Sequence, residues 1–213
     1  MIELKDICFA YDDEPVLNYF SMEVKKGETV VINGDNGCGK STVLSILNGL
    51  LFAEKGTYIF DGEEITEKKI KNQVFSKSFH QKIGYVFQNT ELQLFCSSVY
   101  DEIAFGVRQM GLSQNEIDIR VNDMLSFLNI EKLKSKAPYH LSCGEKKKVA
   151  LASVLVTNPQ VLIIDEPLNF LDKSSSEWMT EFLKSMKQAG KTIIIVTHSQ
   201  QLIHQLGARV IHM

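Results

Sequence analysis

One eight-residue segment of this sequence has the residue types and spacing needed to hold phosphate. It reads G-x-x-x-x-G-K-S and consists of Gly34, Asp35, Asn36, Gly37, Cys38, Gly39, Lys40 and Ser41. Glycines let the main chain curl until several N–H groups face one anion, and a helix beginning near Thr42 would add partial positive charge at its amino end. Lys40 would reach the β- and γ-phosphates, and the Ser41 hydroxyl would bind Mg²⁺. We expect these residues and Thr42 to bind a nucleoside triphosphate.

The sequence on either side of this segment supports that interpretation. A β-rich apolar run at 29–32 precedes it, and a helical pattern of apolar residues at 42–51 follows it. A phosphate loop requires a strand before it and a helix after it. The alternative is a tight turn that happens to contain a lysine and a serine, and the strand–helix context favours the phosphate loop.

Two acidic residues follow a second apolar run. Residues 161–164 read V-L-I-I and are followed directly by Asp165 and Glu166. A strand buried on both faces can deliver carboxylates to the carboxyl edge of a sheet, where ligands of open α/β sheets bind. Asp165 would hold Mg²⁺, directly or through water, and Glu166 would polarise an attacking water. The alternative is a pair of exposed acids at a strand end; together with the phosphate loop, however, the pair predicts Mg²⁺-dependent hydrolysis of a nucleoside triphosphate.

The elements that must position these residues can be read from the apolar pattern. Continuous apolar runs at 161–164 and 192–196 are typical of strands covered on both faces, and further β-rich runs lie at 29–32, 57–60 and 83–87. Helical patterns lie between them, including one that starts at a capping box formed by Ser113 and Glu116. The alternation predicts an α/β fold with a mostly parallel sheet. Residues 88–139 lack a clear buried strand and are expected to be helical.

Composition limits the class of protein. The chain has 213 residues and 23 basic against 26 acidic side chains, a net charge of −3, which argues against a free-standing nucleic-acid binder. No apolar run approaches the roughly 18 residues of a membrane span, and the first residues lack the apolar stretch of a signal peptide. The cysteines show neither a C-x-x-C pair nor zinc-ligand spacing, so free thiols in a reducing compartment are expected.

Leu141-Ser142-Cys143-Gly144-Glu145 resembles the LSGGQ signature of ATP-binding cassette (ABC) ATPases. Four further residues fall in that family's order: Tyr11, Gln88, Asp172 and His198. The resemblance covers essentially the whole chain. It implies ATP and Mg²⁺ as cofactors, and one ABC ATPase domain over 1–213. Segments 1–87 and 158–213 would form a RecA-like core with an antiparallel β part near the N-terminus, and 88–157 would form a helical signature subdomain.

The same resemblance assigns roles to individual residues. Tyr11 would stack on adenine, His198 would hold the γ-phosphate, and Gln88 would link Mg²⁺ and water to the helical subdomain. Ser142, Gly144 and Glu145 would face the ATP of a partner subunit, and Asp172 would couple to that partner's histidine. The sequence departs from the family's signature at Cys143, which replaces a glycine, and at Glu145, which replaces a glutamine. It also departs at Phe170, which replaces a small residue.

Each assignment has a simpler alternative. Tyr11 could be a surface aromatic, Gln88 a loop amide and His198 a partly exposed histidine. Ser142 and Glu145 also form a capping box, which is compatible with a role toward phosphate. Lys146, Lys147 and Lys148 fan out around a helix at 100° steps, which favours a solvated face over a nucleic-acid contact.

A narrower resemblance is to the ATPases of cobalt/nickel and vitamin importers of the energy-coupling-factor type. It rests on the segments 86–89 (V-F-Q-N), 93–95 (Q-L-F) and 99–106 (V-Y-D-E-I-A-F-G). It implies three kinds of partner: a second ABC ATPase subunit, identical or paralogous, a transmembrane coupling subunit and a small membrane protein that binds the substrate. The chain would lie peripherally on the cytoplasmic face of the membrane. Five apolar residues would either line a groove for the membrane partner or pack inside the subdomain: Leu92, Leu94, Phe95, Ile103 and Phe105.

Two other classes of function remain open from the sequence. One is a soluble ABC ATPase that regulates or remodels without transport, although the chain has neither a second cassette nor a long coiled-coil insertion. The other is a P-loop kinase, or a weakly hydrolysing, nucleotide-gated module, although a kinase has no use for the signature segment or His198. The sequence does not indicate whether a metal ion, biotin or another vitamin would be transported.

Overall fold

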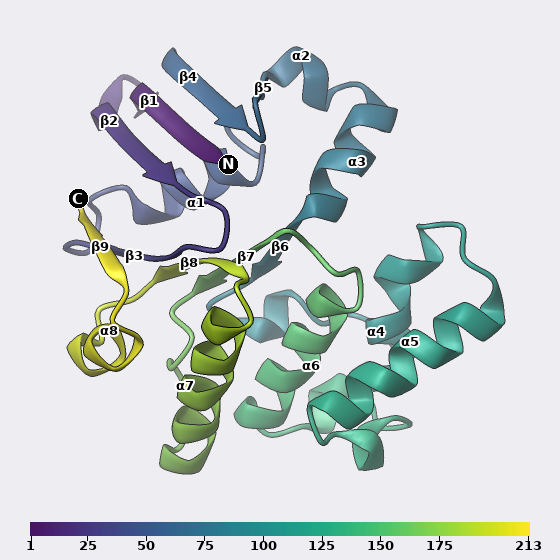
Figure 1. Cartoon of the computed structure of the whole chain (residues 1–213). Helices are drawn as coiled ribbons and strands as arrows, with labels where there is room; N and C mark the ends of the chain where they lie inside the picture. The colour runs from purple at the N-terminus through teal and green to yellow at the C-terminus, as the bar shows by residue number, and fades with distance from the viewer.

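The computed structural model describes all residues, 1–213, and shows an α/β fold with two β-sheets (Figure 1). The larger sheet is parallel, with strand order β6-β7-β8-β3-β9. Its strands are β3 (Thr29–Asn33), β6 (Ile83–Val86), β7 (Val161–Asp165), β8 (Thr192–Val196) and β9 (Arg209–His212). Asp165 and Ile32 both pair with Val196, so the carboxyl ends of β3, β7 and β8 meet at one edge.

The smaller sheet is antiparallel, with strand order β2-β1-β4-β5. It consists of β1 (Ile2–Tyr11), β2 (Glu14–Val24), β4 (Lys55–Phe60) and β5 (Glu63–Glu64). The apolar run at 57–60 therefore belongs to this sheet and not to the parallel one. Asp12 and Asp13, with φ of 46° and 68°, form the tight turn between β1 and β2, a conformation that aspartate tolerates better than most residues. The expected α/β class, with an antiparallel part near the N-terminus, is confirmed.

Helices cover both faces of the parallel sheet. They are α1 (Lys40–Leu47), α2 (Glu67–Ile70), α3 (Gln73–Lys82), α4 (Val99–Arg108), α5 (Gln114–Phe127), α6 (Cys143–Leu155), α7 (Lys173–Gln188) and α8 (Gln200–Leu206). Short 3₁₀ turns occur at η1 (Thr90–Leu92), η2 (Glu131–Leu133) and η3 (Pro138–His140). None of these helices is both long and apolar enough to cross a membrane.

The two faces of the parallel sheet bury different side chains. Val30 and Ile194 pack with α1 and the antiparallel sheet, whereas their neighbours Val31 and Ile195 pack with helices on the opposite side. Helix α1 consequently lies between the two sheets (Figure 1). Successive residues of a strand point to opposite faces, so a strand covered on both sides needs an unbroken apolar run. This burial explains why 161–164 and 192–196 are continuously apolar.

Helix α1 is shorter than the pattern at 42–51 predicts. It begins at Lys40 and ends at Leu47, and Gly49 has a φ of +66°. Glycine adopts this conformation at little cost, so the chain leaves the helix there and Leu50 is exposed. The early start places Lys40 and Ser41 in the first helical turn.

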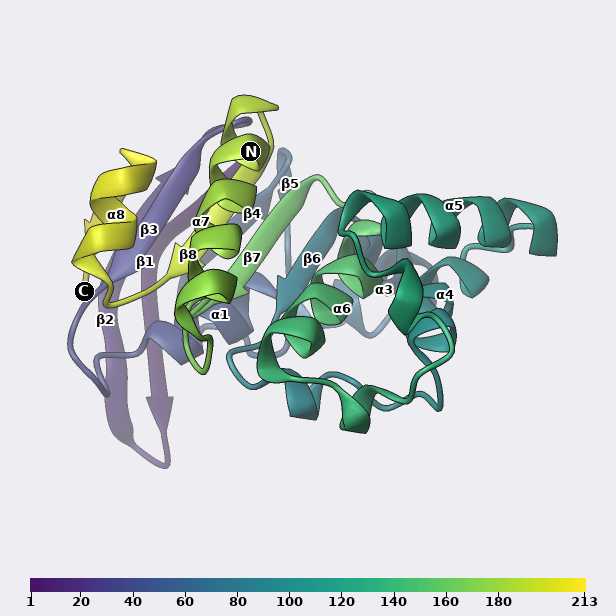
Figure 2. The same cartoon turned by 90° about the horizontal axis from the view of Figure 1, so that it is seen from below.

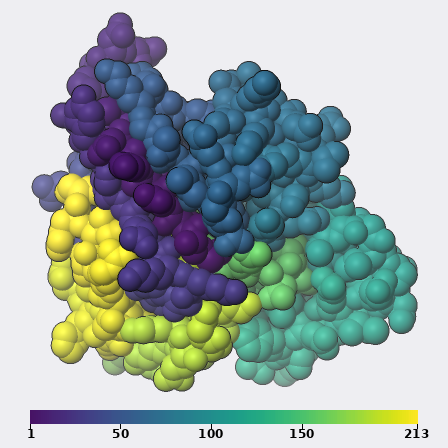
Figure 3. All heavy atoms as spheres, turned by 45° about the horizontal axis from the view of Figure 1, so that its top comes forward, coloured from purple at the N-terminus to yellow at the C-terminus, as the bar shows by residue number.

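Residues 88–157 contain helices and 3₁₀ turns but no strand. Helices α4, α5 and α6 lie beside β6, at the end of the molecule away from α8 and β9 (Figure 2). In the space-filling view this segment forms one side of the molecule, while the C-terminal residues lie against the N-terminal strands on the other (Figure 3). One cluster of 27 buried side chains joins these helices to β7 and β8, so the division into a core and a subdomain stays a prediction.

Candidate active site

The loop between β3 and α1 is closed around the side chain of Lys40. The Lys40 ammonium donates to the carbonyl oxygens of Gly34 and Asp35, each at 2.7 Å. Gly37 and Gly39 have φ of +83° and +100°, and a Cβ on Gly39 would approach Leu17 to 2.8 Å. The positive φ therefore favours glycine at 39, and a Cβ there would also have to displace the Leu17 and Val16 side chains. The first N–H groups of α1 have no partner within the helix, so the loop can present donors to an anion.

The two acids lie where β7 ends, next to the end of β8. Glu166 has a φ of +42°, and its N–H donates to the carbonyl of Val196 at 2.8 Å. Its carboxylate is buried: Oε2 accepts from Thr197 Oγ1 at 3.1 Å, while Oε1 has no hydrogen-bond partner. His198 Nε2 is 3.7 Å from that same Oε1. A buried carboxylate oxygen without a partner is costly, so Glu166 Oε1 is available to a water molecule or a proton donor.

Asp165 lies beside Glu166 in a partly buried position. Burial raises the pKa of the Asp165 carboxyl, the negative charge of Glu166 raises it further, and Lys147 and Lys40 lower it. The charges of these two lysines therefore help to keep the Asp165 carboxylate ionised. The carboxylate oxygens of Asp165 suit a hard divalent cation, whose charge would lower the pKa of Asp165 further.

One cavity of about 520 Å³ brings the predicted chemical groups together. The predicted residues that line it are Tyr11, Asn36, Gly37, Gly39, Lys40, Ser41, Thr42, Gln88, Asp165, Glu166 and His198. Val16, Asn169 and Val196 complete the lining and were not predicted. Phosphate-binding, acidic and aromatic groups thus share one space at the carboxyl edge of the sheet.

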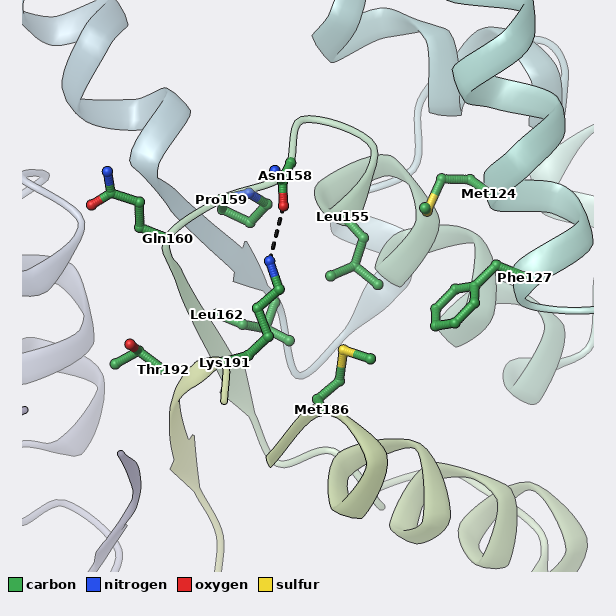
Figure 4. Close-up of a pocket in the computed structure, with 10 residues that line it drawn as sticks. All are labelled: Met124, Phe127, Leu155, Asn158, Pro159, Gln160, Leu162, Met186, Lys191 and Thr192. Atoms are coloured by element: carbon green, nitrogen blue, oxygen red, sulfur yellow. Dashed lines mark hydrogen bonds between the residues drawn. The ribbon is translucent and has the colours of Figure 1, made fainter. Parts of the chain in front are cut away.

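A second cavity, of about 180 Å³, lies at the opposite ends of β7 and β8 (Figure 4). Met124, Leu155 and Met186 supply apolar walls, and Lys191 donates to Asn158 Oδ1 at 2.9 Å. It contains no acid, histidine or cysteine, so it lacks the groups that hydrolysis would need.

The remaining predicted residues do not line the nucleotide-sized cavity. Gly34, Asp35 and Cys38 are not among its lining residues, and a Cβ on Gly34 would lie 2.8 Å from Cys38 Sγ and from Met213 O. Asp172 caps helix α7: its Oδ1 accepts from Ser175 N at 2.7 Å, and hydrogen bonds to the backbone N–H groups there lower the pKa of Asp172.

The signature residues form the start of helix α6. Ser142 N donates to Glu145 Oε2 at 2.8 Å and Glu145 N donates to Ser142 Oγ at 3.3 Å, so the predicted capping box is present. The backbone hydrogen bond from Ser142 lowers the pKa of Glu145. Because the Glu145 carboxylate turns back to cap its own helix, it does not extend freely toward a neighbouring phosphate. A Cβ on Gly144 would lie 2.3 Å from Ser175 Oγ and 3.0 Å from Ser175 Cβ, so a larger residue there would have to displace the Ser175 side chain of α7.

The prediction of a solvated lysine face at 146–148 is wrong. Lys147 is only 2% exposed, and its ammonium donates to the carbonyl oxygens of Phe87 and Gln88 at 3.3 and 3.2 Å. Burial lowers the pKa of Lys147 to about 8, while the charges of Asp165 and Glu166 raise it. Lys146 instead pairs with Glu91 at the surface, and Lys148 lies 4.4 Å from the Trp178 ring centroid. The three lysines do fan out, but one of the three directions points into the protein.

Thr197 is the other functional candidate that sequence reasoning missed. It is fully buried, holds Glu166 and accepts from Ser199 N at 3.2 Å. Its place between the apolar strand β8 and His198 was visible in the sequence, but nothing there showed which acid it would reach.

Comparisons with known proteins agree with this fold and cavity. Residues 17–169 match the sequence family described as ABC transporter. The nickel import ATP-binding protein LarO of Lactiplantibacillus plantarum is 44% identical over 211 residues, which cover 99% of this chain and 88% of LarO. The structure of CbiO1 from Clostridium perfringens, described as part of the ABC transporter complex CbiONQ, matches with a TM-score of 0.82 and 38% identity, covering 93% of this chain and 78% of CbiO1.

A dimeric structure of the ATP-binding cassette MJ0796, in a post-hydrolysis state with ADP and phosphate, matches with a TM-score of 0.87. Its identity to this chain is 27%, and the match covers 100% of this chain and 94% of the cassette. The fold and the cavity define a P-loop protein that binds and hydrolyses a nucleotide. The chain belongs to the ABC transporter family of ATP-binding proteins and is an ATPase. Its relatives include energy-coupling factor and nickel import ATP-binding proteins, which confirms the narrower resemblance.

Proposed function

We propose that this chain is the ATP-hydrolysing subunit of an energy-coupling-factor type importer, and that ATP-driven closure of an ATPase dimer powers the uptake of a metal ion or vitamin. The observation that carries the catalytic part is the position of Glu166 Oε1, which is buried without a hydrogen-bond partner in the cavity that contains the phosphate loop. The name of LarO supports import, and that of CbiO1 supports assembly with other transporter subunits.

ATP would lie along the cavity from Tyr11 to Glu166. The Tyr11 ring is about half exposed and packs edge-on against Phe9, with ring centroids 4.8 Å apart, which leaves a face open to stack on adenine. The phosphates would lie on the loop N–H groups of 34–42. The Lys40 ammonium would then exchange its hydrogen bonds to the carbonyls of Gly34 and Asp35 for hydrogen bonds to the β- and γ-phosphates.

The oxygen donors in the cavity fit Mg²⁺. Ser41, Gln88 and Asp165 line the same space, whereas no group of three or more histidine, cysteine, aspartate or glutamate residues forms a metal cluster. Few protein ligands suit a cation that keeps several waters and phosphate oxygens. When bound, Mg²⁺ would neutralise charge that develops on the phosphates.

Glu166 would act as general base on the attacking water. Thr197 fixes one carboxylate oxygen, so the other is held in place to accept a proton. His198 is exposed, and its Nε2 lies 3.7 Å from Glu166 Oε1, so it would hold the γ-phosphate beside the general base. Gln88, which lines the same cavity, would orient the water.

A second ABC ATPase subunit, a copy of this chain or a paralogue, would complete the site. The exposed start of α6 at Ser142 and Gly144 would face the partner's ATP, with the Glu145 cap holding that helix end in shape, and Asp172 would lie at the same interface. The dimeric form of the similar cassette supports this arrangement. Cys143 and Phe170 are both exposed, so their side chains would lie in that interface.

An apolar groove would receive the transmembrane coupling subunit, which works with a membrane protein that binds the substrate. A cavity of about 310 Å³ is lined by Glu91, Leu94, Phe95, Cys96, Pro138, Tyr139 and Lys146. Of the five apolar residues singled out in the sequence, Leu92, Phe95 and Phe105 are exposed, Leu94 packs partly on the core and Ile103 is fully buried. Leu94 and Phe95 therefore line the groove, and Phe105 packs edge-on against Phe95 with ring centroids 5.0 Å apart, whereas Leu92 lies outside the lining and Ile103 is a packing residue. The chain would thus bind peripherally at the cytoplasmic face of the membrane.

The test of the catalytic proposal is the variant E166Q, with E64Q at an exposed strand position as its matched control. E166Q should still bind ATP and dimerise with it, while phosphate release falls to background, and E64Q should behave as wild type. K40A should lose ATP binding, and K77A, which changes an exposed lysine on α3, should keep it. Unchanged turnover in E166Q would reject Glu166 as base, and ATP binding unchanged in K40A would reject the site itself.

A further inference from the structure

Lys147 is a buried cation that lies outside the nucleotide cavity but contacts its wall. Its ammonium is bonded to the main-chain carbonyls of Phe87 and Gln88, and of these residues only Gln88 lines the cavity. An ammonium group is expensive to bury unless it is paired, and a methionine would fill similar space without that cost. The sequence therefore retains a charged donor at a position where packing alone does not need one.

A second side chain ties the same segment to the same helix. Gln93 Oε1 accepts from Phe87 N at 3.0 Å, and Gln93 Nε2 donates to the carbonyl of Ala150 on α6 at 3.4 Å. The carbonyl of Phe87 thus accepts from Lys147, which is part of α6. The N–H of Phe87 donates to Gln93, which in turn bonds to α6. At the surface, Lys146 of α6 pairs with Glu91. Segment 87–93 and helix α6 are held together at three places.

We propose that Lys147 is a positioning residue that sets the location of the Gln88 amide in the nucleotide cavity by holding the carbonyls of Phe87 and Gln88 against helix α6. This inference rests on the proposed hydrolytic function of that cavity. Ser142 caps the start of helix α6, so the bond also joins Gln88 to the helix end that would face a partner's ATP. The hydrogen bonds of the Lys147 ammonium go to Phe87 and Gln88 and not to the phosphate loop, so loss of this donor is expected to change turnover and not ATP affinity.

Three variants separate donation from packing. K147M keeps the length of the side chain but has no donor. It is expected to lower kcat roughly 10- to 100-fold, the cost of a small misplacement of a catalytic group, with the KM for ATP within about twofold of wild type. K147R and K147Q keep at least one N–H donor and should both restore most of the turnover; restoration by K147R alone would assign the effect to the charge of Lys147 near Asp165 and Glu166, and would overturn the inference. The matched control is K148M, because Lys148 lies over Trp178 and does not bond to the 87–93 segment.

A double-mutant cycle shows whether Lys147 acts through Gln88. In a Q88A background, K147M should lower kcat no further, because the group that it positions is absent. A purely structural lysine would give the same additional loss in both backgrounds. Thermal unfolding of each variant, with and without ATP, checks that the proteins are folded and bind nucleotide.

Several results would overturn the inference. They are wild-type kcat in folded K147M, a rise in KM that accounts for the whole loss, no restoration by either K147R or K147Q, or full additivity with Q88A. An absence of ATP hydrolysis by the wild-type protein, alone and with its partner subunits, would instead reject the proposed function, so the two failures are distinguishable.

Discussion

Thr197 Oγ1 lies 3.1 Å from Glu166 Oε2, and this contact leaves Glu166 Oε1 as the one buried carboxylate oxygen of the pair without a hydrogen bond. Because Thr197 is itself fully buried and follows strand β8, its hydroxyl has little freedom to move. The side chain of a general base must hold one orientation to accept a proton efficiently. Thr197, which directly follows β8, would give Glu166 that orientation in its proposed role as general base.

We therefore predict that T197V lowers kcat about tenfold while the KM for ATP changes little. Valine keeps the shape of threonine but leaves Glu166 Oε2 without its donor, and an unsatisfied buried group costs roughly 1–3 kcal/mol. Steady-state ATPase assays measure the effect. T180V is the matched control, because Thr180 is also buried but bonds to Ser176 O on α7. Equal losses in the two variants would show that the effect is one of stability.

The phosphate loop and the acid pair could be predicted from sequence because each is a local pattern at the end of a strand. Once 29–32 and 161–164 are parallel strands of one sheet, their carboxyl ends must meet, and Asp165 is found in register with Val196. Ser142 and Glu145 were predictable for the same reason, since a capping box spans only four residues.

Lys147 could not be predicted in this way. Its partners lie 59 and 60 residues earlier in the chain, and its burial follows from how α6 packs against the end of β6. The local sequence alone, with three consecutive lysines, predicts side chains exposed to solvent. Thr197 was missed because a threonine at the end of a strand is common, and only the sheet register brings it to Glu166. The sequence pattern placed the end of helix α1 too late, because apolar residues continue past Gly49 after the helix has ended.

Tyr11 gives a prediction about ATP affinity. Y11A should raise the KM for ATP about tenfold with kcat nearly unchanged at saturating ATP, because stacking of an aromatic ring on a base contributes on the order of 1–3 kcal/mol. Y11W should bind as well as wild type. Y19A removes a more exposed tyrosine of strand β2 that does not line the cavity, and it should have no effect. A KM for Y11A equal to that of Y19A would place adenine elsewhere.

Two glycines with similar conformations give a prediction about stability. Gly56 and Gly62 have φ of +93° and +83°, but a Cβ on Gly56 would lie 2.4 Å from the carbonyl oxygens of Lys5 and Asp6, whereas one on Gly62 would meet nothing within 4 Å. G62A should lower the free energy of unfolding by about 1 kcal/mol through backbone strain alone. G56A should cost roughly 2 kcal/mol more, because β4 must move away from β1. Urea denaturation of both variants measures the difference, and equal costs would contradict the close approach of these strands.

The ion pair between Glu28 and Arg209 gives a prediction about pH. Arg209 Nε donates to Glu28 Oε1 at 2.7 Å, and this bond holds the pKa of Glu28 below its ordinary value of 4.5. Because the folded pKa is the lower one, the pair stabilises the protein above about pH 4.5, and this contribution disappears as the pH falls through the folded pKa. Arg209 is 48% exposed and solvent weakens the attraction, so E28Q should lower the free energy of unfolding at pH 7 by only about 0.5–1 kcal/mol.

The difference in free energy of unfolding between wild type and E28Q, measured by urea denaturation, should shrink toward pH 3.5. Glu63 pairs with Lys69, and its side chain is 52% exposed against 22% for Glu28, so the control E63Q should change stability less at either pH. A difference for E28Q that grows as the pH falls would mean that the carboxylate is destabilising, and the assigned ion pair would then be wrong.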